Sequence, residues 1–412
     1  MSANSFVQSL LDGAEIKWVP LGEVTQYEQP AAYLVRGTNY NADFATPVLT
    51  AGKTFILGYT DEVDGIYAAS KSPVIIFDDF TTANKWVDFD FKAKSSAMKM
   101  ITAAEDANVL LKYVYYWLNT LPSGLTEGDH TRHWISNYSK KTIPIPCPDD
   151  PVRSLKIQGE IVRILDSFTE LTAELTAELT ARAKQFAYYR EELLSFRAGE
   201  VEWQPLAKVG QFIRGRRFTK ADYVDTGGIP VIHYGEIYTH YGTSATRAVS
   251  QVRANLADSL RYAEPGDVVI AGVGETVEEV GKAVAWLGDG KVAIHDDSYA
   301  FRHTINPKFV SYYLQTARFN AEKVQHVSRG KMKRLLIDGK IEKTSIPIPF
   351  PADRKRSLAE QARIVAILDK FDTLTNSNSE GLPSEIELRQ QQHEHYRDLL
   401  LNFPKPVQEA DA

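Results

Sequence analysis

Hydrophobic residues in two long segments recur at steps of three and four positions. Between residues 154 and 196, apolar side chains stand at positions 157, 161, 164, 165, 168, 171, 175 and 179. This spacing lines one face of an amphipathic helix and is typical of a coiled coil. As one continuous helix, the segment would extend about 65 Å. A second such segment starts at Ser357, and Gly381-Leu382-Pro383 predicts a break or kink before the pattern continues to Leu401.

Two other regions have the patterns of short strands. Between residues 18 and 143, the run 74–77 is apolar and the run 86–91 alternates between apolar and polar residues. These patterns predict a buried strand and a half-buried strand. Residues 110–118 are more helical in character, and residues 268–270 form a comparable apolar run in the second region. Both regions are therefore predicted to be mixed α/β domains.

The chain repeats itself. WVPL at 18–21 returns as WQPL at 203–206, and IPIP at 143–146 returns at 346–349. Further identities follow in the helical segments and end with YR at 189–190 and 396–397. Agreement at so many positions indicates an internal duplication. The first residues resemble the tail of a repeat unit, because Leu10-Leu11 precede Trp18 much as Leu193-Leu194 precede Trp203.

The duplication determines the predicted organisation. We expect a first α/β domain over residues 1–148, a central spacer helix over 149–200, a second α/β domain over 201–351 and a C-terminal spacer helix over 352–412. The predicted fold class is mixed α/β. Two α/β domains are separated by two long antiparallel coiled-coil helices, with a pseudo-two-fold internal repeat.

Composition sets limits on the function. The net charge of −6 over 412 residues argues weakly against nucleic acid as a partner, because phosphate binding requires a basic surface. Lys and Arg nevertheless cluster in a few places. The single cysteine, Cys147, excludes an internal disulfide and makes a Cys-rich zinc site implausible. No apolar run reaches the roughly 18 residues of a membrane helix, and the N-terminus lacks the pattern of a signal peptide. We therefore expect a cytoplasmic protein without a membrane partner.

Familiar catalytic motifs are missing from the sequence. The nearest match to a phosphate-binding P-loop, Gly281-Lys282, is followed by Ala283 and has Thr276 where the first glycine belongs. Asp296-Asp297 lacks the further residues of a nuclease site, and a turn at a strand end is the better interpretation. His295 has too few partners for zinc and is expected at the surface. We expect no catalytic residue, metal or cofactor in this chain, and an unfamiliar nuclease or methylase is a weaker alternative.

Three features carry a resemblance to a known family: the twin IPIP-to-helix segments, the spacer EIVRILDSFTELTAELTAELTARAKQFAYYREELLSF and its partner ARIVAILDKFDTLTNSNSEGLPSEIELRQQQHEHYRDLLLNF. Over essentially its whole length the chain resembles the specificity subunit (HsdS) of type I restriction-modification systems. The tandem TAEL units within the spacer are similar to those of one subgroup of that family.

The resemblance implies that two target-recognition domains each recognise one half of a split site in double-stranded DNA. It implies that the helices act as spacer and as docking surface for two methyltransferase (HsdM) subunits, which bind S-adenosylmethionine and methylate adenine. Restriction and translocase (HsdR) subunits would supply ATP-driven translocation and cleavage, with ATP and Mg on those partner subunits. None of this chemistry would lie in the present chain.

Residue chemistry and loop placement give the candidate DNA contacts, since the family supplies no fixed motif for base recognition. Base edges are contacted by Arg, Lys, Asn, Gln, Ser or Thr on loops, and further cations hold phosphates. A solvated surface role is about as probable for each residue singly. His233 and Tyr234 correspond by repeat position to Thr50 and Ala51. The candidates are Lys53, Thr54, Thr81, Thr82, Asn84, Lys85, Lys92, Lys94, Ser95, Arg214, Arg216, Arg217, Lys220, His233, Tyr234, Arg329, Lys331 and Lys333.

The tandem TAEL units contain Thr172, Leu175, Thr176 and Leu179. Each four-residue unit adds about 6 Å of helix and about 40° of rotation. One interpretation is a ruler whose unit number sets the distance between the domains. The alternative is a stutter in a structural coiled coil.

A protein of a different class stays open from the residues alone: a coiled-coil interaction scaffold that joins two protein-binding domains without DNA. The basic loops bearing Thr and Asn favour DNA recognition, because a protein-binding scaffold would not need them.

Overall fold

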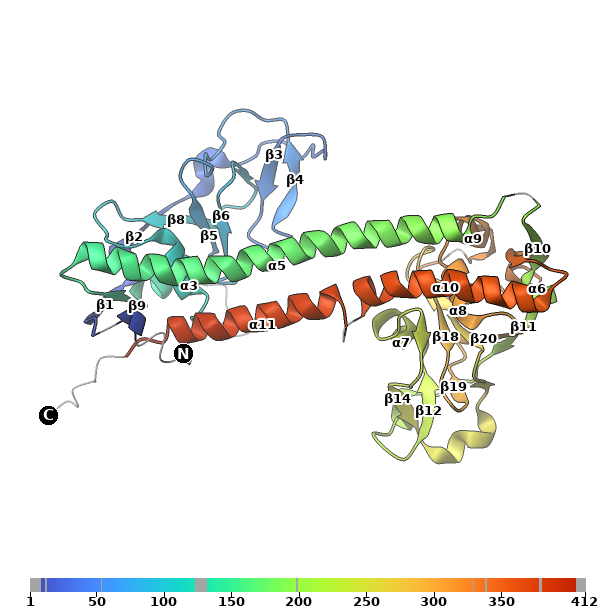
Figure 1. The fold of residues 1–412 in the computed structure, drawn as a ribbon. Helices are drawn as coiled ribbons and strands as arrows, with labels where there is room; N and C mark the ends of the chain where they lie inside the picture. Colours follow the sequence, from blue (N-terminus) through green and yellow to red (C-terminus); the bar gives the residue numbers. More distant parts are fainter. Residues whose placement is uncertain are drawn as a thin grey trace. The chain divides into compact units, whose positions relative to one another are not determined.

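The computed structural model describes residues 9–11, 13–52, 54–122, 132–197, 199–328, 330–337, 339–377 and 380–404. The chain divides into two compact units, one formed by Met1–Ala173 with Leu388–Ala412 and the other by Glu174–Glu387. Each unit holds a sheet-rich domain and the helix segments that pack on it (Figure 1). The predicted mixed fold, with a long helix between two sheet-rich domains in the sequence, is confirmed. The four domain boundaries stay a prediction.

The first helical segment forms one uninterrupted helix, α5 (Pro151–Leu194), of 44 residues. Pro151 suits the first turn, where its missing N–H costs no hydrogen bond. The predicted apolar stripe is buried at Ile157, Ile161 and Leu165. The continuity assumed for the spacer is therefore confirmed.

The second helical segment is interrupted, as predicted. Helix α10 (Arg354–Asn376) ends and α11 (Leu382–Leu400) begins around a short connection that contains Gly381. The φ of Gly381 is +116°, a conformation that favours glycine. Pro383 lies in the first turn of α11 rather than in the break itself. None of the helices in the described parts of the chain is long and apolar enough to span a membrane.

In the first unit, four antiparallel strands form a sheet of order β2-β8-β5-β6. A second sheet has the order β4-β3-β7, and β1 pairs with β9. The strands are β1 (Ile16–Pro20), β2 (Thr25–Glu28), β3 (Thr46–Leu49), β4 (Ile56–Thr60), β5 (Val74–Asp78), β6 (Asn84–Val87), β7 (Lys92–Ala93), β8 (Met98–Ala103) and β9 (Thr142–Pro146). The short helices are α2 (Leu21–Val24), α3 (Leu111–Leu118), α4 (His133–Ser136), η1 (Pro30–Tyr33) and η2 (Tyr138–Lys140).

The second unit has a five-stranded sheet of order β11-β20-β16-β18-β13 and a four-stranded sheet of order β14-β12-β19-β15. Two further pairs are β17 with β21 and β10 with β22. The strands are β10 (Val201–Pro205), β11 (Gly210–Arg214), β12 (Ile229–Ile232), β13 (Ser244–Ala245), β14 (Ser250–Val252), β15 (Tyr262–Ala263), β16 (Val268–Ala271), β17 (Val273–Gly274), β18 (Ala283–Trp286), β19 (Val292–Ile294), β20 (Ser298–His303), β21 (Lys333–Arg334) and β22 (Ser345–Pro349). The short helices are α6 (Leu206–Val209), α7 (Tyr234–Thr239), α8 (Pro307–Tyr313), α9 (Ala317–Lys323), η3 (Lys220–Asp222), η4 (Ala254–Ser259), η5 (Val324–His326) and η6 (Ile341–Lys343).

The duplicated sequence builds the same framework in both units. β1 and β10 pair antiparallel with the two IPIP strands, so that each tryptophan faces a proline of its partner strand. The Tyr116 hydroxyl donates a hydrogen bond to Asp166 at 2.5 Å, and the Tyr312 hydroxyl donates one to Asp369 at 2.7 Å. Each of these aspartates also forms an ion pair, with Lys112 or Lys308. The repeated residues thus fasten each sheet domain to its helix.

Aromatic stacking joins the helices within each unit. In the first unit, Phe168 of α5 stacks on Tyr396 of α11 with ring centroids 5.2 Å apart. In the second unit, Tyr189 of α5 stacks on Phe371 of α10 at 5.1 Å. These contacts account for the apolar stripes that the sequence pattern identified.

Candidate nucleic-acid interface

A basic loop follows β11 in the second unit. Arg214 ends that strand, Arg216, Arg217 and Lys220 follow it, and all four side chains are exposed. The intervening Gly215 packs so closely that an added Cβ would lie 2.0 Å from the carbonyl oxygen of His295. Only glycine permits such an approach of two backbone segments. The local sequence therefore holds the arginines at a fixed position on the surface.

Two further arginines from distant parts of the chain contact this loop or the neighbouring turn between β19 and β20. Arg261 Nη1 donates to the carbonyl oxygen of Arg214 at 3.3 Å, and Arg334 forms an ion pair with Asp297 at 3.0 Å. Both side chains are exposed. Neither was among the predicted contacts. Tertiary packing brings them here, and no sequence pattern predicts that arrangement.

His233 and Tyr234 lie beside His295 in an aromatic group. The rings of His233 and Tyr234 are 4.4 Å apart, and those of His233 and His295 are 4.6 Å apart. His233 caps α7, where its Nδ1 accepts a hydrogen bond from the Gly235 N–H at 3.1 Å. Burial, followed by the electrostatic effect of His295, lowers the pKa of His233 against the opposing effect of Asp297 and Asp296. The ring is therefore neutral at pH 7 and can exchange hydrogen bonds without adding charge.

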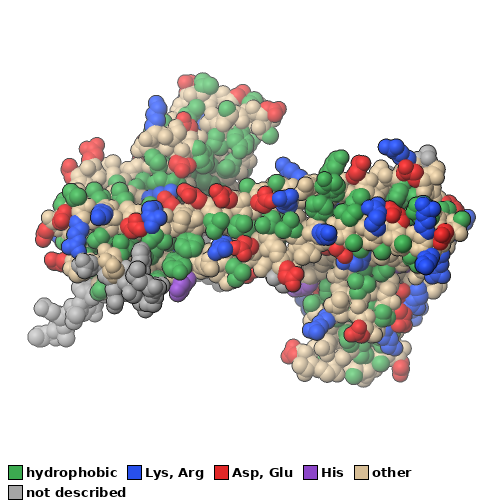
Figure 2. Space-filling model, viewed as in Figure 1, with side chains coloured by type: hydrophobic (Ala, Val, Ile, Leu, Met, Phe, Trp, Pro, Cys, Tyr) green, Lys and Arg blue, Asp and Glu red, His purple; other side chains and the backbone are tan. Residues whose placement is uncertain are grey.

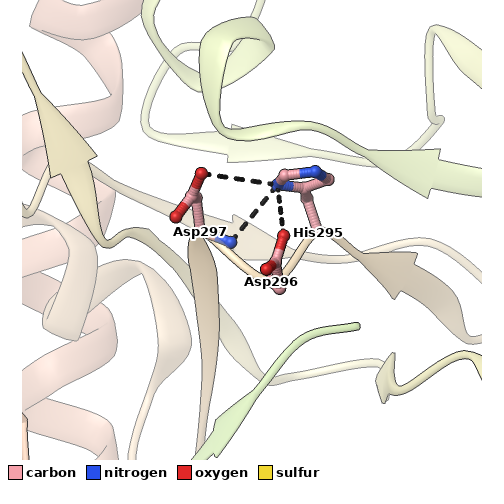
Figure 3. A group of neighbouring side chains, drawn as sticks. All are labelled: His295, Asp296 and Asp297. Atoms are coloured by element: carbon pink, nitrogen blue, oxygen red, sulfur yellow. Dashed lines mark hydrogen bonds and ion pairs between the residues drawn. The ribbon is translucent and has the colours of Figure 1, made fainter. Parts of the chain in front are cut away.

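His295 is buried, and the expectation that it lies at the surface is wrong. The side chain is 8 % exposed because it packs under Phe218, at a ring distance of 4.9 Å. Its Nδ1 lies 3.2 Å from an Asp296 carboxylate oxygen and 3.9 Å from one of Asp297 (Figure 3). These three residues could hold a divalent cation, since their ligand atoms lie within 4.8 Å of one another. Asp297 is already paired with Arg334. That the chain binds no metal stays a prediction.

The second basic cluster follows η5. Lys331 is exposed, whereas Lys333 is half-buried and its Nζ donates to the carbonyl oxygen of Gly330 at 2.7 Å. Strand β21, which contains Lys333, pairs with β17. Arg329 lies outside the described residues. Lys331 is thus the better placed of the two described lysines for a phosphate contact.

The candidate DNA contacts of the first unit include fewer charged residues than those of the second unit, and they lie farther apart in the fold. Thr54, Thr81, Lys85 and Lys94 are exposed, whereas Ser95 and Asn84 are half-buried. The Thr81 hydroxyl donates to Asp78 at 2.7 Å and closes the tight turn between β5 and β6. Strand pairing places Lys94 after β7, on a different sheet from Lys85. The structure gathers these residues less closely than the basic loop of the second unit.

Two predicted contacts are not available at the surface. Lys92 is 2 % exposed, because its Nζ is 3.1 Å from Glu62 and donates to the carbonyl oxygen of Asp64 at 2.6 Å. Thr82 is 6 % exposed and occupies the turn with a φ of +60°. We therefore correct the assignment of Lys92 and Thr82 to DNA contact. Lys53 lies outside the described residues.

Sequence reasoning also missed a run of three basic residues at the start of α10. Arg354, Lys355 and Arg356 are exposed, and the guanidinium of Arg356 lies 3.8 Å from the centre of the Phe350 ring. The consecutive charges were a signal in the sequence. On the face shown in Figure 2, Lys and Arg side chains gather around α10 and β11. Positive charge is therefore concentrated locally in a chain that is acidic overall.

The fold and this surface define a duplicated protein. Two different sheet-rich domains stand on one repeated framework, and exposed arginines are concentrated on the second. Residues 200–388 match the family model described as a type I restriction modification DNA specificity domain. The chain is 51 % identical to the EcoR124I/EcoR124II type I restriction enzyme specificity subunit of Escherichia coli, over 98 % of this chain and 99 % of that protein. The chain belongs to the family of type I restriction-modification specificity subunits.

More distant relatives agree over the full length. A putative type I restriction enzyme specificity subunit from Haemophilus influenzae is 29 % identical and covers 97 % of this chain and 98 % of its own length. The crystal structure of the type I restriction-modification S subunit from M. genitalium has the same fold, with a TM-score of 0.56 at 14 % identity, covering 96 % of this chain and 98 % of that one. The two sheet-rich domains and the helices are therefore those of this family.

Proposed function

We propose that this chain selects the DNA target of a type I restriction-modification enzyme. Each sheet-rich domain recognises one half of a bipartite double-stranded site. The observation that carries the proposal is the 51 % identity to a type I restriction enzyme specificity subunit across both repeated halves. The sheets of the two domains differ in strand order, whereas the framework beneath them is repeated. Two different sheet-rich domains on a repeated helical framework are expected for a DNA site whose two half-sites differ in sequence.

The exposed side chains of the second domain have the chemistry that DNA recognition requires. Arginine can form two parallel hydrogen bonds to guanine in the major groove, and lysine or arginine can contact phosphates. Arg214, Arg216 and Arg217 are fixed beside Gly215, and Lys331 lies on a second exposed loop. In the first domain, Thr81, Lys85 and Lys94 are the exposed candidates. These groups support the proposal without identifying the bases.

The duplicated helical framework suits two equal partners. Two methyltransferase subunits would dock on it, and restriction subunits would join that complex. The repeated helix residues, among them the IPIP-to-helix segments, give each unit an equivalent surface for one such subunit. S-adenosylmethionine, ATP and Mg would bind to the partner subunits. In this proposal the chain supplies specificity and contributes no catalytic group.

A salt-dependent gel shift with the partner methyltransferase tests the proposal. The complex should bind DNA that carries the host's modified sequence, with an affinity that falls as salt rises. Lys331→Ala should lower the slope of log affinity against log salt by about 1 if that residue touches a phosphate. Lys333→Ala should have less effect, because its ammonium group is already bonded to Gly330. Lys208→Ala, at another exposed lysine of the second unit, is the matched control.

Failure of the methyltransferase complex to bind any DNA specifically would contradict the proposal. It would favour the interaction scaffold in its place. An unchanged slope for Lys331→Ala would assign that lysine to the solvated surface and leave the function itself standing.

A further inference from the structure

A cavity of about 440 Å³ lies in the second unit, apart from the basic loop after β11. Its walls include α5, α9 and the loop that connects β17 to β18. It adjoins a smaller cavity, of about 320 Å³, and the two share Tyr238, Lys282 and Gln315. We refer to the larger cavity as the Lys282 pocket.

Three cationic side chains line the Lys282 pocket: Arg190, Lys282 and Lys323. Lys323 is only 2 % exposed, and its Nζ donates one hydrogen bond, to the carbonyl oxygen of Glu278 at 2.9 Å. Lys282 is half-buried and makes no side-chain hydrogen bond or ion pair among the described residues. Arg190 Nε is buried, with no partner in the same part of the structure. Several N–H donors therefore have no acceptor.

The acidic groups nearby form no ion pair with either lysine in the described structure. Glu278 and Glu279 line the pocket with exposed side chains, and Asp372 of the adjoining cavity acts on Lys282 only through its charge. Arg190 forms an ion pair with Glu191 at 3.6 Å and donates a hydrogen bond to Gln315 at 3.4 Å. Lys282, Lys323 and the Nε–H of Arg190 consequently keep donor capacity that the described carboxylates do not use.

The loop that contains Lys282 is held in place. The Tyr238 hydroxyl donates to the carbonyl oxygen of Val273 at 2.9 Å, and the Gly281 N–H donates to that of Ala271 at 2.9 Å. Gly281 has a φ of +89°, and a Cβ there would lie 3.2 Å from Lys323 Cδ. Gly281 of the pair that fails as a P-loop motif thus packs against Lys323, and Lys282 and Lys323 line the same pocket. A preformed group of donors lowers the cost of ordering on binding.

Burial of these ammonium groups has an electrostatic cost. Burial lowers the pKa of Lys282, and it lowers the pKa of Lys323 to about 8. An anion in the pocket would offset this loss of hydration and favour the charged forms.

We propose that the Lys282 pocket binds a phosphate group, held by the ammonium groups of Lys282 and Lys323 and by the Nε–H of Arg190. The lining of this pocket includes none of the candidate base contacts of the basic loop after β11. The phosphate could belong to the DNA backbone beside the recognised bases or to a free nucleotide, since both present the same oxygens. Phosphate suits the unused donors, because each of its oxygens can accept several charge-assisted hydrogen bonds.

Calorimetric titration of the full-length chain with pyrophosphate, and separately with ATP, tests the site. Saturable binding of pyrophosphate is expected, with at least a tenfold loss in Lys282→Gln. Arg190→Gln provides a second variant that leaves both buried lysines in place. Lys208→Gln, an exposed lysine outside the pocket, should bind pyrophosphate as the unaltered chain does.

The salt dependence of DNA binding by the methyltransferase complex distinguishes a DNA backbone phosphate from a free one. A salt slope lowered by about 1 in Lys282→Gln would identify a backbone phosphate. Loss of pyrophosphate binding with an unchanged slope would identify a free or nucleotide phosphate. If the unaltered chain binds no pyrophosphate and the slope is unchanged in Lys282→Gln, the proposal is overturned. The same holds if the variant loses only its methyltransferase partner, which would indicate an acidic protein segment instead.

Discussion

Hydrogen bonds between a tyrosine and an aspartate connect each sheet domain to its helix. Burial raises the pKa of Tyr312, and the charge of Asp372 and the hydrogen bond to Asp369 raise it further, so the hydroxyl stays protonated and donates at any ordinary pH. The same pair in the first unit is Tyr116 and Asp166. These side chains have a structural role that their positions in the repeat explain.

Tyr312→Phe should destabilise the chain by about 1–2 kcal/mol, because a hydrogen bond to a charged acceptor is lost while the ring stays in place. Asp369 keeps its ion pair with Lys308, which limits the loss. Denaturant unfolding monitored by fluorescence measures the change. Tyr188→Phe removes an exposed hydroxyl and serves as the control. Equal stability of the two variants would show that the Tyr312 bond contributes nothing.

Stability should fall in mild acid because of His303. Burial lowers the pKa of His303 to about 4, whereas an unfolded histidine titrates near 6.5. As the pH falls from about 6.5 to about 4, His303 becomes protonated in the unfolded chain but stays neutral in the folded chain. The free energy of unfolding should therefore drop by about 2 kcal/mol between pH 7.5 and pH 5 from this residue.

The test compares unfolding at both pH values for the unaltered chain and for His303→Gln, in which the drop should be smaller by that amount. His240→Gln changes an exposed histidine and should leave the drop as it was. Identical pH dependence in all three proteins would show that His303 titrates normally when folded.

At the level of single residues, the sequence indicated which kinds of residue could contact DNA better than it indicated where those residues lie in the fold. The exposed arginines from 214 to 217 were predicted, because a run of cations beside glycine rarely lies in a core. Lys92 was misassigned, since it is buried by the pairing of β7 with β3 and by an ion pair with Glu62, both of which join distant residues. Arg261 and Arg334 were missed for the same reason. Contacts between distant segments are set by tertiary packing, which one sequence does not reveal.

At the scale of elements, the helices were predicted more accurately than the sheets. The three-and-four spacing identified α5, and glycine with proline identified the break between α10 and α11, whereas the continuity of α5 was assumed and comes from the structure. Many strands of the second unit have only two to four residues. Such short strands leave little periodic signal, so their order could not be derived from the pattern.

The continuity of α5 allows the ruler interpretation of the TAEL units to be tested. Thr172, Leu175, Thr176 and Leu179 lie within one unbroken helix that begins in the first unit and ends in the second. Deleting residues 176–179 removes about 6 Å and about 40° of rotation. One DNA base pair turns about 34° and rises about 3.4 Å. Twist should dominate, because a domain turned out of phase faces the wrong groove, whereas small translations can be absorbed by bending.

The deletion variant, assembled with its methyltransferase, should therefore prefer a non-specific spacer shorter by one base pair, with both half-sites unchanged. Methylation of DNA duplexes with varied spacer lengths measures the optimum. Thr176→Ala keeps the helix length and should keep the optimum of the unaltered chain. A folded deletion variant with the original spacer preference would identify the TAEL units as ordinary coiled-coil residues.

At the scale of the whole molecule, the duplication separates what is shared from what is specific. Strand β10 begins the second sheet-rich domain and β22 ends it, and the two strands pair with each other. Between them, the domain contacts its helix through interactions that the first unit repeats, among them Tyr312 with Asp369 and a backbone N–H with Gln361. The domain is thus attached through features that its first-unit counterpart also has.

This modular attachment predicts that the two half-sites are recognised independently. Replacing residues 201–351 by the corresponding domain of the Haemophilus influenzae relative exchanges both β10 and β22, so no strand pair is left half native. Sequencing of host DNA with detection of modified bases should then show one new half-site and one unchanged half-site. The reciprocal exchange of the first domain should alter the other half. If a single exchange changed both half-sites, the domains would determine the target jointly. The repeated framework would then have to transmit the effect of one domain to the other.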